Sequence, residues 1–144
     1  MLYHLLYISE ESSFFDQQRD MEDILKTSQK NNGQAQLTGI LIKNDKLFIQ
    51  LLEGDSKSVE KMYTKISKDR RHKSIRKLLE YKSKERIFPR WSMGYVNLAS
   101  ENENENENEI KLKEIIPFIH KDIIKLKSSK EKILSILKNF NSAS

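Results

Sequence analysis

A chain of 144 residues with a net charge of +5 is the size of one ordinary domain and long enough to bury a core. The absence of cysteine excludes disulfides, thiolate metal sites and cysteine nucleophiles. No apolar run approaches the ~20 residues of a membrane-spanning helix. The amino-terminal residues lack the basic region and cleavage site of a signal peptide, so we expect a cytoplasmic protein.

The first half of the chain alternates between strand and helix patterns. Apolar and aromatic residues over 3–9 predict a first strand. Apolar residues spaced three to four apart predict a helix from about 16 to 30, followed by a loop over the Asn- and Gly-containing residues 31–36. Residues 37–43 and 46–53 are typical of two strands joined as a hairpin.

The next elements complete a sheet. Gly54 and Asp55 end the preceding strand and cap a second helix, whose core face we expect to carry apolar residues. Residues 74–83 and 91–98 predict two further strands. The order β-α-β-β-α-β-β predicts an α+β, ferredoxin-like sheet with both helices on one face and one extra strand. The apolar residues of the second helix are Val59, Met62, Tyr63 and Ile66.

The carboxy-terminal third differs in composition. The alternating glutamates and asparagines of 101–109 predict an acidic low-complexity linker over 99–109, after a sheet domain of residues 1–98. Residues 110–144 carry two amphipathic helical patterns. We expect these two helices to pack on the free face of the sheet.

One polar residue interrupts an apolar strand. Gln50 lies in the middle of "KLFIQLLEG", where an unpartnered buried amide costs roughly 1–3 kcal/mol. In the predicted topology Tyr7 is its neighbour, and Asn31 and Asn32 leave the first helix at the same end of the sheet. Each residue alone has an ordinary structural explanation. Together they would line a slot between the helices that suits a flat, neutral heteroaromatic ligand.

Six segments resemble the BLUF domains, which are blue-light sensors using FAD. Order and spacing both match, over residues 1 to about 98. The matching segments are "LLYIS", "ILKTSQKNN", "LTGILI", "LFIQLLEG", "VEKMYTKISKDRRH" and "RIFPRWSMGYVNL".

This resemblance implies a role for each matching residue. The flavin ring would lie between Ile24 and Ile66, and Gln50 would lie between the N5/O4 edge of the ring and the hydroxyl of Tyr7. FAD is the implied cofactor, with FMN open. The remaining implied contacts are Asn31 and Asn32 at the pyrimidine edge, Trp91 or Met93 on the fifth strand, and Lys65 and Arg71 near the ribityl-phosphate tail.

The resemblance also implies photochemistry without enzymatic activity. Tyr7 would supply an electron and a proton through Gln50, whose rearrangement gives a new hydrogen bond to the flavin carbonyl and a red-shifted absorption. No covalent bond forms, in agreement with the absence of cysteine. The signal would pass through the fifth strand and the carboxy-terminal helices to an unidentified partner protein or into homo-oligomers.

Three other functions fit the fold less well. Residues 55–90 carry 13 lysines and arginines against 5 acidic residues, which favours a nucleic-acid-binding module, but the third strand lacks the aromatics that stack bases. A hydrolase of acylphosphatase type needs an arginine after the first strand, where "SEESSFFD" stands instead. An interaction protein without a cofactor is the third alternative. Colour separates them, because a flavoprotein is yellow.

Overall fold

The computed structural model describes residues 1–98 and 134–138 of the chain. Its contacts divide the chain into two compact units, Met1–Asn97 and Leu98–Ser144. In the second unit, residues 134–138 are helical, and Ile136 and Leu137 are buried. The expected linker over 99–109 and the expected pair of helices over 110–144 fall, apart from this turn, outside the described residues.

The first unit follows the predicted order of elements, β-α-β-β-α-β-β. The helices begin where the sequence places an aspartate, since Asp16 accepts a hydrogen bond from the Arg19 N–H and Asp55 accepts one from the Ser58 N–H. The elements are β1 (Leu2–Glu11), α1 (Gln17–Ala35), β2 (Thr38–Asn44), β3 (Leu47–Gly54), α2 (Ser56–Ser67), β4 (His72–Ser83) and β5 (Gly94–Asn97).

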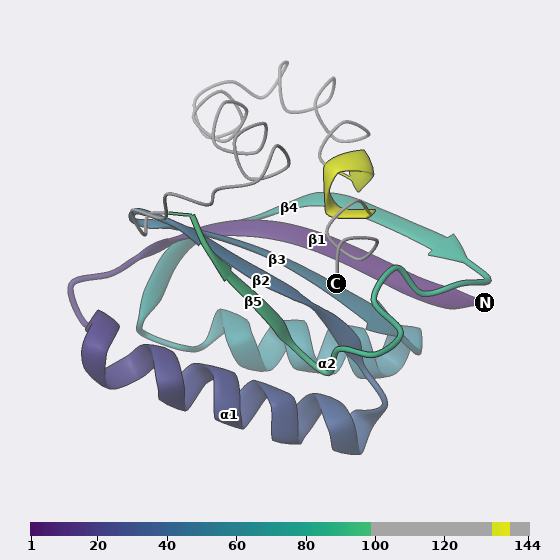
Figure 1. Ribbon diagram of the computed structural model, residues 1–144, viewed down its shortest axis with the longest axis horizontal. Helices are drawn as coiled ribbons and strands as arrows, with labels where there is room; N and C mark the ends of the chain where they lie inside the picture. The colour runs from purple at the N-terminus through teal and green to yellow at the C-terminus, as the bar shows by residue number, and fades with distance from the viewer. Residues whose placement is uncertain (99–133, 139–144) are drawn as a thin grey trace. The chain divides into compact units, whose positions relative to one another are not determined.

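The five strands form one mixed sheet in the order β4-β1-β3-β2-β5. β1 pairs with β3 and β4 in antiparallel register, β2 pairs with β3 in the same way, and β5 lies parallel to β2. Figure 1 shows both helices on one face of this sheet. The predicted ferredoxin-like fold with one extra strand is confirmed.

The core between the helices and the sheet has the predicted periodicity. Strand residues two apart point to the same face, so Phe48 and Leu52 on β3 join Leu5 and Tyr7 on β1 beneath the helices. The predicted apolar face of α2 packs there, with Val59 fully buried.

The first helix is longer than predicted. It continues through residues 31–35, where we expected a loop, and ends when Gln36 adopts a left-handed conformation with φ 57°. The Gln36 N–H is directed to the carbonyls of Asn32 and Gly33, which closes the last turn. A Cβ added at Gly33 would meet nothing within 4 Å, so no close approach requires glycine at this position of the helix.

The last strand is shorter than predicted. β5 begins at Gly94, whereas the sequence predicted a strand from residue 91. Trp91 turns back over Gly94, where an added Cβ would come within 2.3 Å of the indole. Residues 91–93 are therefore a bend that leads into β5.

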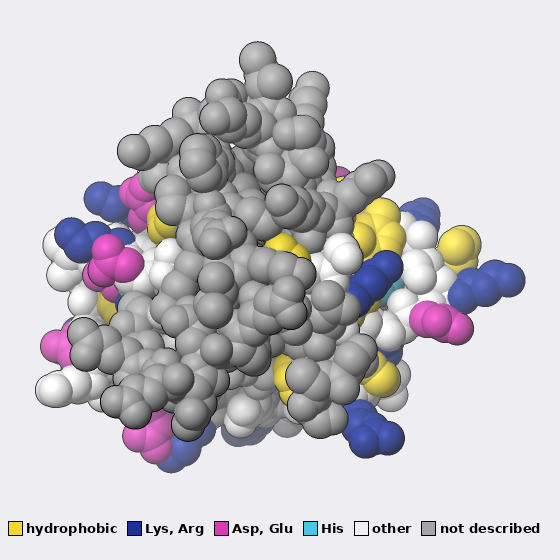
Figure 2. All heavy atoms as spheres, turned by 45° about the horizontal axis from the view of Figure 1, so that its top comes forward, with side chains coloured by type: hydrophobic (Ala, Val, Ile, Leu, Met, Phe, Trp, Pro, Cys, Tyr) yellow, Lys and Arg dark blue, Asp and Glu magenta, His cyan; other side chains and the backbone are white. Residues whose placement is uncertain are grey.

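The described residues visible in Figure 2 show mixed charge. In Figure 2, Lys and Arg side chains alternate with Asp and Glu side chains around the part of this face that belongs to the described residues. Within those residues, no helix is both long and apolar enough to cross a membrane.

Candidate functional site

Tyr7 and Gln50 face each other across the centre of the sheet. They are cross-strand partners on β1 and β3, and both side chains point toward the helices. The Tyr7 hydroxyl donates a hydrogen bond to Gln50 Oε1. Tyr7 is 2% exposed and Gln50 is 4% exposed, so this pair is removed from water. The pairing predicted from topology is therefore present.

The other end of the Gln50 amide meets sulfur. Gln50 Nε2 lies 3.5 Å from Sδ of Met93, which is itself buried. A thioether is a weak acceptor, so this contact orients the amide without satisfying both of its N–H groups. One end of Gln50 is firmly bonded and the other is weakly held.

The surroundings of Tyr7 keep its phenol neutral. Burial raises the pKa of Tyr7 well above its ordinary value, and the neighbouring Tyr63 adds to the increase. The rings of these two tyrosines meet edge to face, with centroids 5.4 Å apart. A phenol that holds its proton in this way remains a hydrogen-bond donor to Gln50 at any physiological pH.

A cavity of about 330 Å³ opens beside this pair, between α1 and α2. Its size lies at the lower end of the range of small-molecule sites. Both helices and the strands contribute apolar side chains to its walls. These are Leu41, Phe48 and Met62, together with the predicted Ile24 and Ile66. Of the residues predicted for the site, those that line the cavity are Tyr7, Ile24, Asn31, Gln50, Lys65, Ile66 and Arg71.

Three predicted residues lie elsewhere. Trp91 stacks on Phe88, with ring centroids 5.3 Å apart, and does not line the cavity. Met93 reaches the site only through Gln50. Asn32 is buried on α1, where Nδ2 donates to the Ser92 carbonyl at 2.6 Å and Oδ1 has no partner among the described residues.

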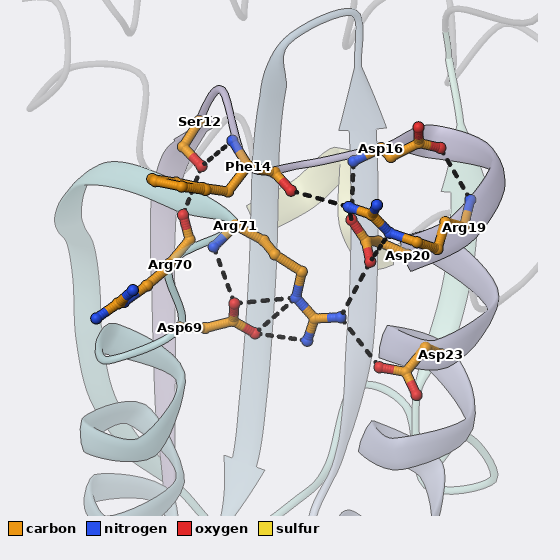
Figure 3. A network of polar contacts seen from close by, with 9 residues as sticks. All are labelled: Ser12, Phe14, Asp16, Arg19, Asp20, Asp23, Asp69, Arg70 and Arg71. Atoms are coloured by element: carbon orange, nitrogen blue, oxygen red, sulfur yellow. Dashed lines mark hydrogen bonds and ion pairs between the residues drawn. The ribbon is translucent and has the colours of Figure 1, made fainter.

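Arg71 bridges the turn after α2 and the first helix (Figure 3). Its guanidinium makes bonds of 2.6–3.1 Å to both carboxylate oxygens of Asp69, and Nη1 lies 3.0 Å from Asp23 and 3.8 Å from Asp20. The guanidinium holds the pKa of Asp69 below its usual range. Arg71 therefore already has carboxylate partners at the mouth of the cavity.

The sequence did not reveal all of the lining residues. Phe48 lies two residues before Gln50, so strand alternation alone places it on the same face. His72 was visible in the "DRRH" segment, but its role depends on long-range contacts. Its Nδ1 lies 2.9 Å from Ser9 Oγ and its Nε2 lies 2.6 Å from the Ile66 carbonyl, so the imidazole joins β1 to α2.

The cavity fits a flat ring with polar edges. Hydrophobic faces on two helices can sandwich such a ring, and carboxamides at the base can bond its carbonyl and imide groups. Asn31 and Gln50 are the two carboxamides among the residues that line the cavity. Fold and site thus define a small α+β domain whose cavity between the helices suits a heteroaromatic ligand.

Comparison with known proteins identifies the family. Residues 2–94 match the family described as "BLUF: Sensors of blue-light using FAD". The chain belongs to the BLUF family. Residues 2–94 are therefore a blue-light-sensing domain that binds flavin. The match gives no support to the nucleic-acid alternative.

Individual relatives agree with this assignment. The photoactivated adenylate cyclase subunit beta of Euglena gracilis is 32% identical over 75 residues, which are 51% of this chain and 9% of that protein. The ground state of BlsA is 28% identical, with a TM-score of 0.76 over 96% of this chain and 88% of that one. The BLUF protein BlrB in its dark state is 25% identical, with a TM-score of 0.75 over 99% and 97%. The chain spans under a tenth of the curated relative's length.

Proposed function

We propose that the chain is a reversible blue-light switch in which the Gln50 side chain is the element that changes state. The observation that carries this proposal is the buried hydrogen bond from Tyr7 to Gln50 at the base of a ring-sized cavity. An amide has a donor end and an acceptor end, so its rotation or tautomerisation changes the bonds that it offers. Such a side chain is a two-state element.

The cavity residues would hold the flavin by shape and by hydrogen bonds. Ile24 on α1 and Ile66 on α2 would contact the two faces of the ring. Asn31 would bond its polar pyrimidine edge. Asn32 does not line the cavity, so its proposed contact with this edge would need its side chain, now bonded to the Ser92 carbonyl, to turn toward the ring. Gln50 would meet the N5/O4 edge from the base of the cavity.

When bound, the flavin absorbs blue light and becomes a strong oxidant. Tyr7 would give one electron to this oxidant, and Gln50 Oε1 is the first group positioned to accept its phenolic proton. Once the electron and the proton had returned to Tyr7, Gln50 would be left rotated or tautomerised and could donate a new hydrogen bond to the flavin carbonyl. This bond would shift the absorption to the red. The cycle leaves no covalent bond, which suits a chain without cysteine.

FAD is the proposed cofactor, on the description of the family, and FMN would make the same contacts at the ring. The phosphate contacts would come from Lys65 and, once displaced from Asp69 and Asp23, from Arg71. Denaturing the purified protein and separating the released flavins by chromatography identifies the bound form.

The proposed output runs through the segment next to Gln50. Met93 lies against Gln50 and is followed directly by β5, so a rotated amide would alter the contacts at the start of this strand. The receiver would be a partner protein or a second copy of the chain. On this route the change would pass from β5 to the expected carboxy-terminal helices. Hydrogen exchange over residues 110–141 in darkness and in light tests the route, and identical protection in both states would refute it.

The decisive experiment is optical. The purified protein is expected to be yellow, and its visible spectrum should shift to the red under blue light and return in darkness. A colourless preparation that does not take up added FAD or FMN, or a yellow one without a reversible shift, contradicts the proposal.

A further inference from the structure

A second buried polar cluster lies at the end of β3, away from the cavity. Glu53 is 0% exposed, and its carboxylate accepts hydrogen bonds from the backbone N–H groups of Ile87 at 2.8 Å and Phe88 at 2.6 Å. Thr38 Oγ1 donates to the same carboxylate at 3.1 Å, and Nδ1 of His4 lies 3.1 Å from it. None of these residues lines the cavity.

This cluster is built to hold a charge. A buried carboxylate is costly unless donors surround it. Burial raises the pKa of Glu53, but the contact with His4 and the bonds from the two backbone N–H groups outweigh burial and leave the pKa below its usual value. Tyr81 stacks on the imidazole of His4, with centroids 4.3 Å apart and planes 3° apart, and fixes the ring in place.

The segment that Glu53 holds leads to the photochemical site. Arg86, just before the two bonded amides, donates to the carbonyls of Gln36 at 2.8 Å and Glu53 at 3.0 Å. Phe88 then stacks on Trp91. Residues 86–93 are thus fastened at their start by Glu53 and Arg86.

The same segment is fastened again near its end. The Trp91 carbonyl accepts from the Gly39 N–H at 3.0 Å, and the Ser92 carbonyl accepts from Asn32 at 2.6 Å. The next residue is Met93, whose sulfur lies against Gln50. Glu53 and Gln50 are three residues apart on β3 and therefore point to opposite faces, so this segment is the route that joins them.

We propose that Glu53 is a positioning residue for the light response: its carboxylate fixes residues 86–93 and so keeps the sulfur of Met93 against the amide nitrogen of Gln50. This inference rests on the proposed function. Glu53 touches neither the cavity nor Gln50 and acts only through the segment. Since sulfur is a weak acceptor, the contact favours the dark orientation of Gln50 without locking it. Loss of this contact changes the rate at which the protein returns to its dark state. The photochemistry itself remains possible.

The test is the dark-recovery rate of Glu53→Gln in the full, flavin-loaded chain. The substituted amide carries an NH₂ group that cannot accept from a backbone N–H, so one of the two backbone bonds is lost. The dark orientation of Gln50 is then less favoured, and recovery after blue light should slow about tenfold, the change expected for one charge-assisted hydrogen bond. The dark spectrum and flavin content should stay at wild-type values. An unchanged or faster recovery overturns the inference.

Controls separate positioning from general destabilisation. Val59→Ala, on the buried face of α2, should lower the melting temperature and leave the recovery rate unchanged. If Glu53→Gln does not fold, Arg86→Met removes the other bonds at the start of the segment and should slow recovery in the same way, and an unchanged rate there overturns the inference. A wild-type protein without any light-induced shift refutes the proposed function itself. A normal wild-type response with unaffected variants refutes only the role of Glu53.

Discussion

The hydroxyl of Tyr7 and the side-chain amide of Gln50 form a closed, dry contact at matched positions of β1 and β3. A conservative substitution of either Tyr7 or Gln50 leaves the cavity walls in place, because those walls come mainly from the two helices and from apolar strand residues. Binding of the flavin and its light response can therefore be separated by substitution.

Gln50→Leu removes both polar ends of the amide while keeping its bulk. We expect flavin to remain bound and the light-induced red shift to disappear, because leucine offers no alternative hydrogen bond. The Tyr7 hydroxyl loses its acceptor at a cost of roughly 1–3 kcal/mol in unfolding free energy, partly offset by the buried leucine. Visible spectra before and after illumination check this. Gln18→Leu, on the exposed surface of α1, is the matched control. A reversible shift in Gln50→Leu would exclude the amide as the switch.

Tyr7→Phe removes the proton donor and keeps the aromatic packing. The red shift should again be lost, since phenylalanine supplies neither the proton nor an easily removed electron. Tyr63→Phe is the control, because Tyr63 touches the Tyr7 ring at its edge and makes no described bond to Gln50. The same illumination spectra apply. If Tyr7→Phe responds like the wild type, the donor lies elsewhere.

The raised pKa of Tyr7 predicts a light response that survives alkaline pH. An ordinary phenol is half ionised near pH 10, whereas Tyr7 should still carry its proton there because burial disfavours the phenolate. The neutral buried phenol contributes stability that is fully present below about pH 10. This stability is lost progressively as the pH rises from there through the higher folded-state pKa. The amplitude of the red shift should be equal at pH 8 and about pH 10. A drop by half near pH 10 would contradict the shift in pKa.

Arg71→Met opens the link between α1 and the turn after α2. Loss of these bonds should weaken flavin binding about tenfold, or ~1.4 kcal/mol, as measured by titrating the apoprotein. Lys26→Met is the control, because the pair of Lys26 with Glu22 is highly exposed and contributes little to stability. An equal loss of affinity for riboflavin and for FAD means that Arg71 helps to close the cavity. A loss of affinity confined to FAD means that Arg71 contacts phosphate. Wild-type affinity for both flavins would show that it does neither.

Local patterns in the sequence predicted the order of elements, the helix starts and the apolar face of α2. These features depend on residues a few positions apart, which periodicity and capping report directly. The pairing of Tyr7 with Gln50 followed from topology, since a ferredoxin-like order puts the first and third strands side by side. The general position of the site was thus available before the structure.

The errors arose where distant residues decide the local conformation. Asn32 remains helical while bonded to Ser92, which is 60 residues away. No sequence pattern around Asn32 predicts that bond. Trp91 folds over Gly94 and onto Phe88, so an apolar run that looked like strand is a bend. The carboxylates around Arg71 come from two elements far apart in the sequence, and charge counting alone described this region as basic.

The stacking of Trp91 on Phe88 has a practical consequence for watching the switch at work. Trp91 is the sole tryptophan of the chain, and it lies two residues before the methionine that touches Gln50. Its ultraviolet emission therefore comes from one place, the hinge-like bend ahead of β5. Time-resolved fluorescence of the unlabelled protein can follow how that bend moves. This signal is independent of the visible absorption change.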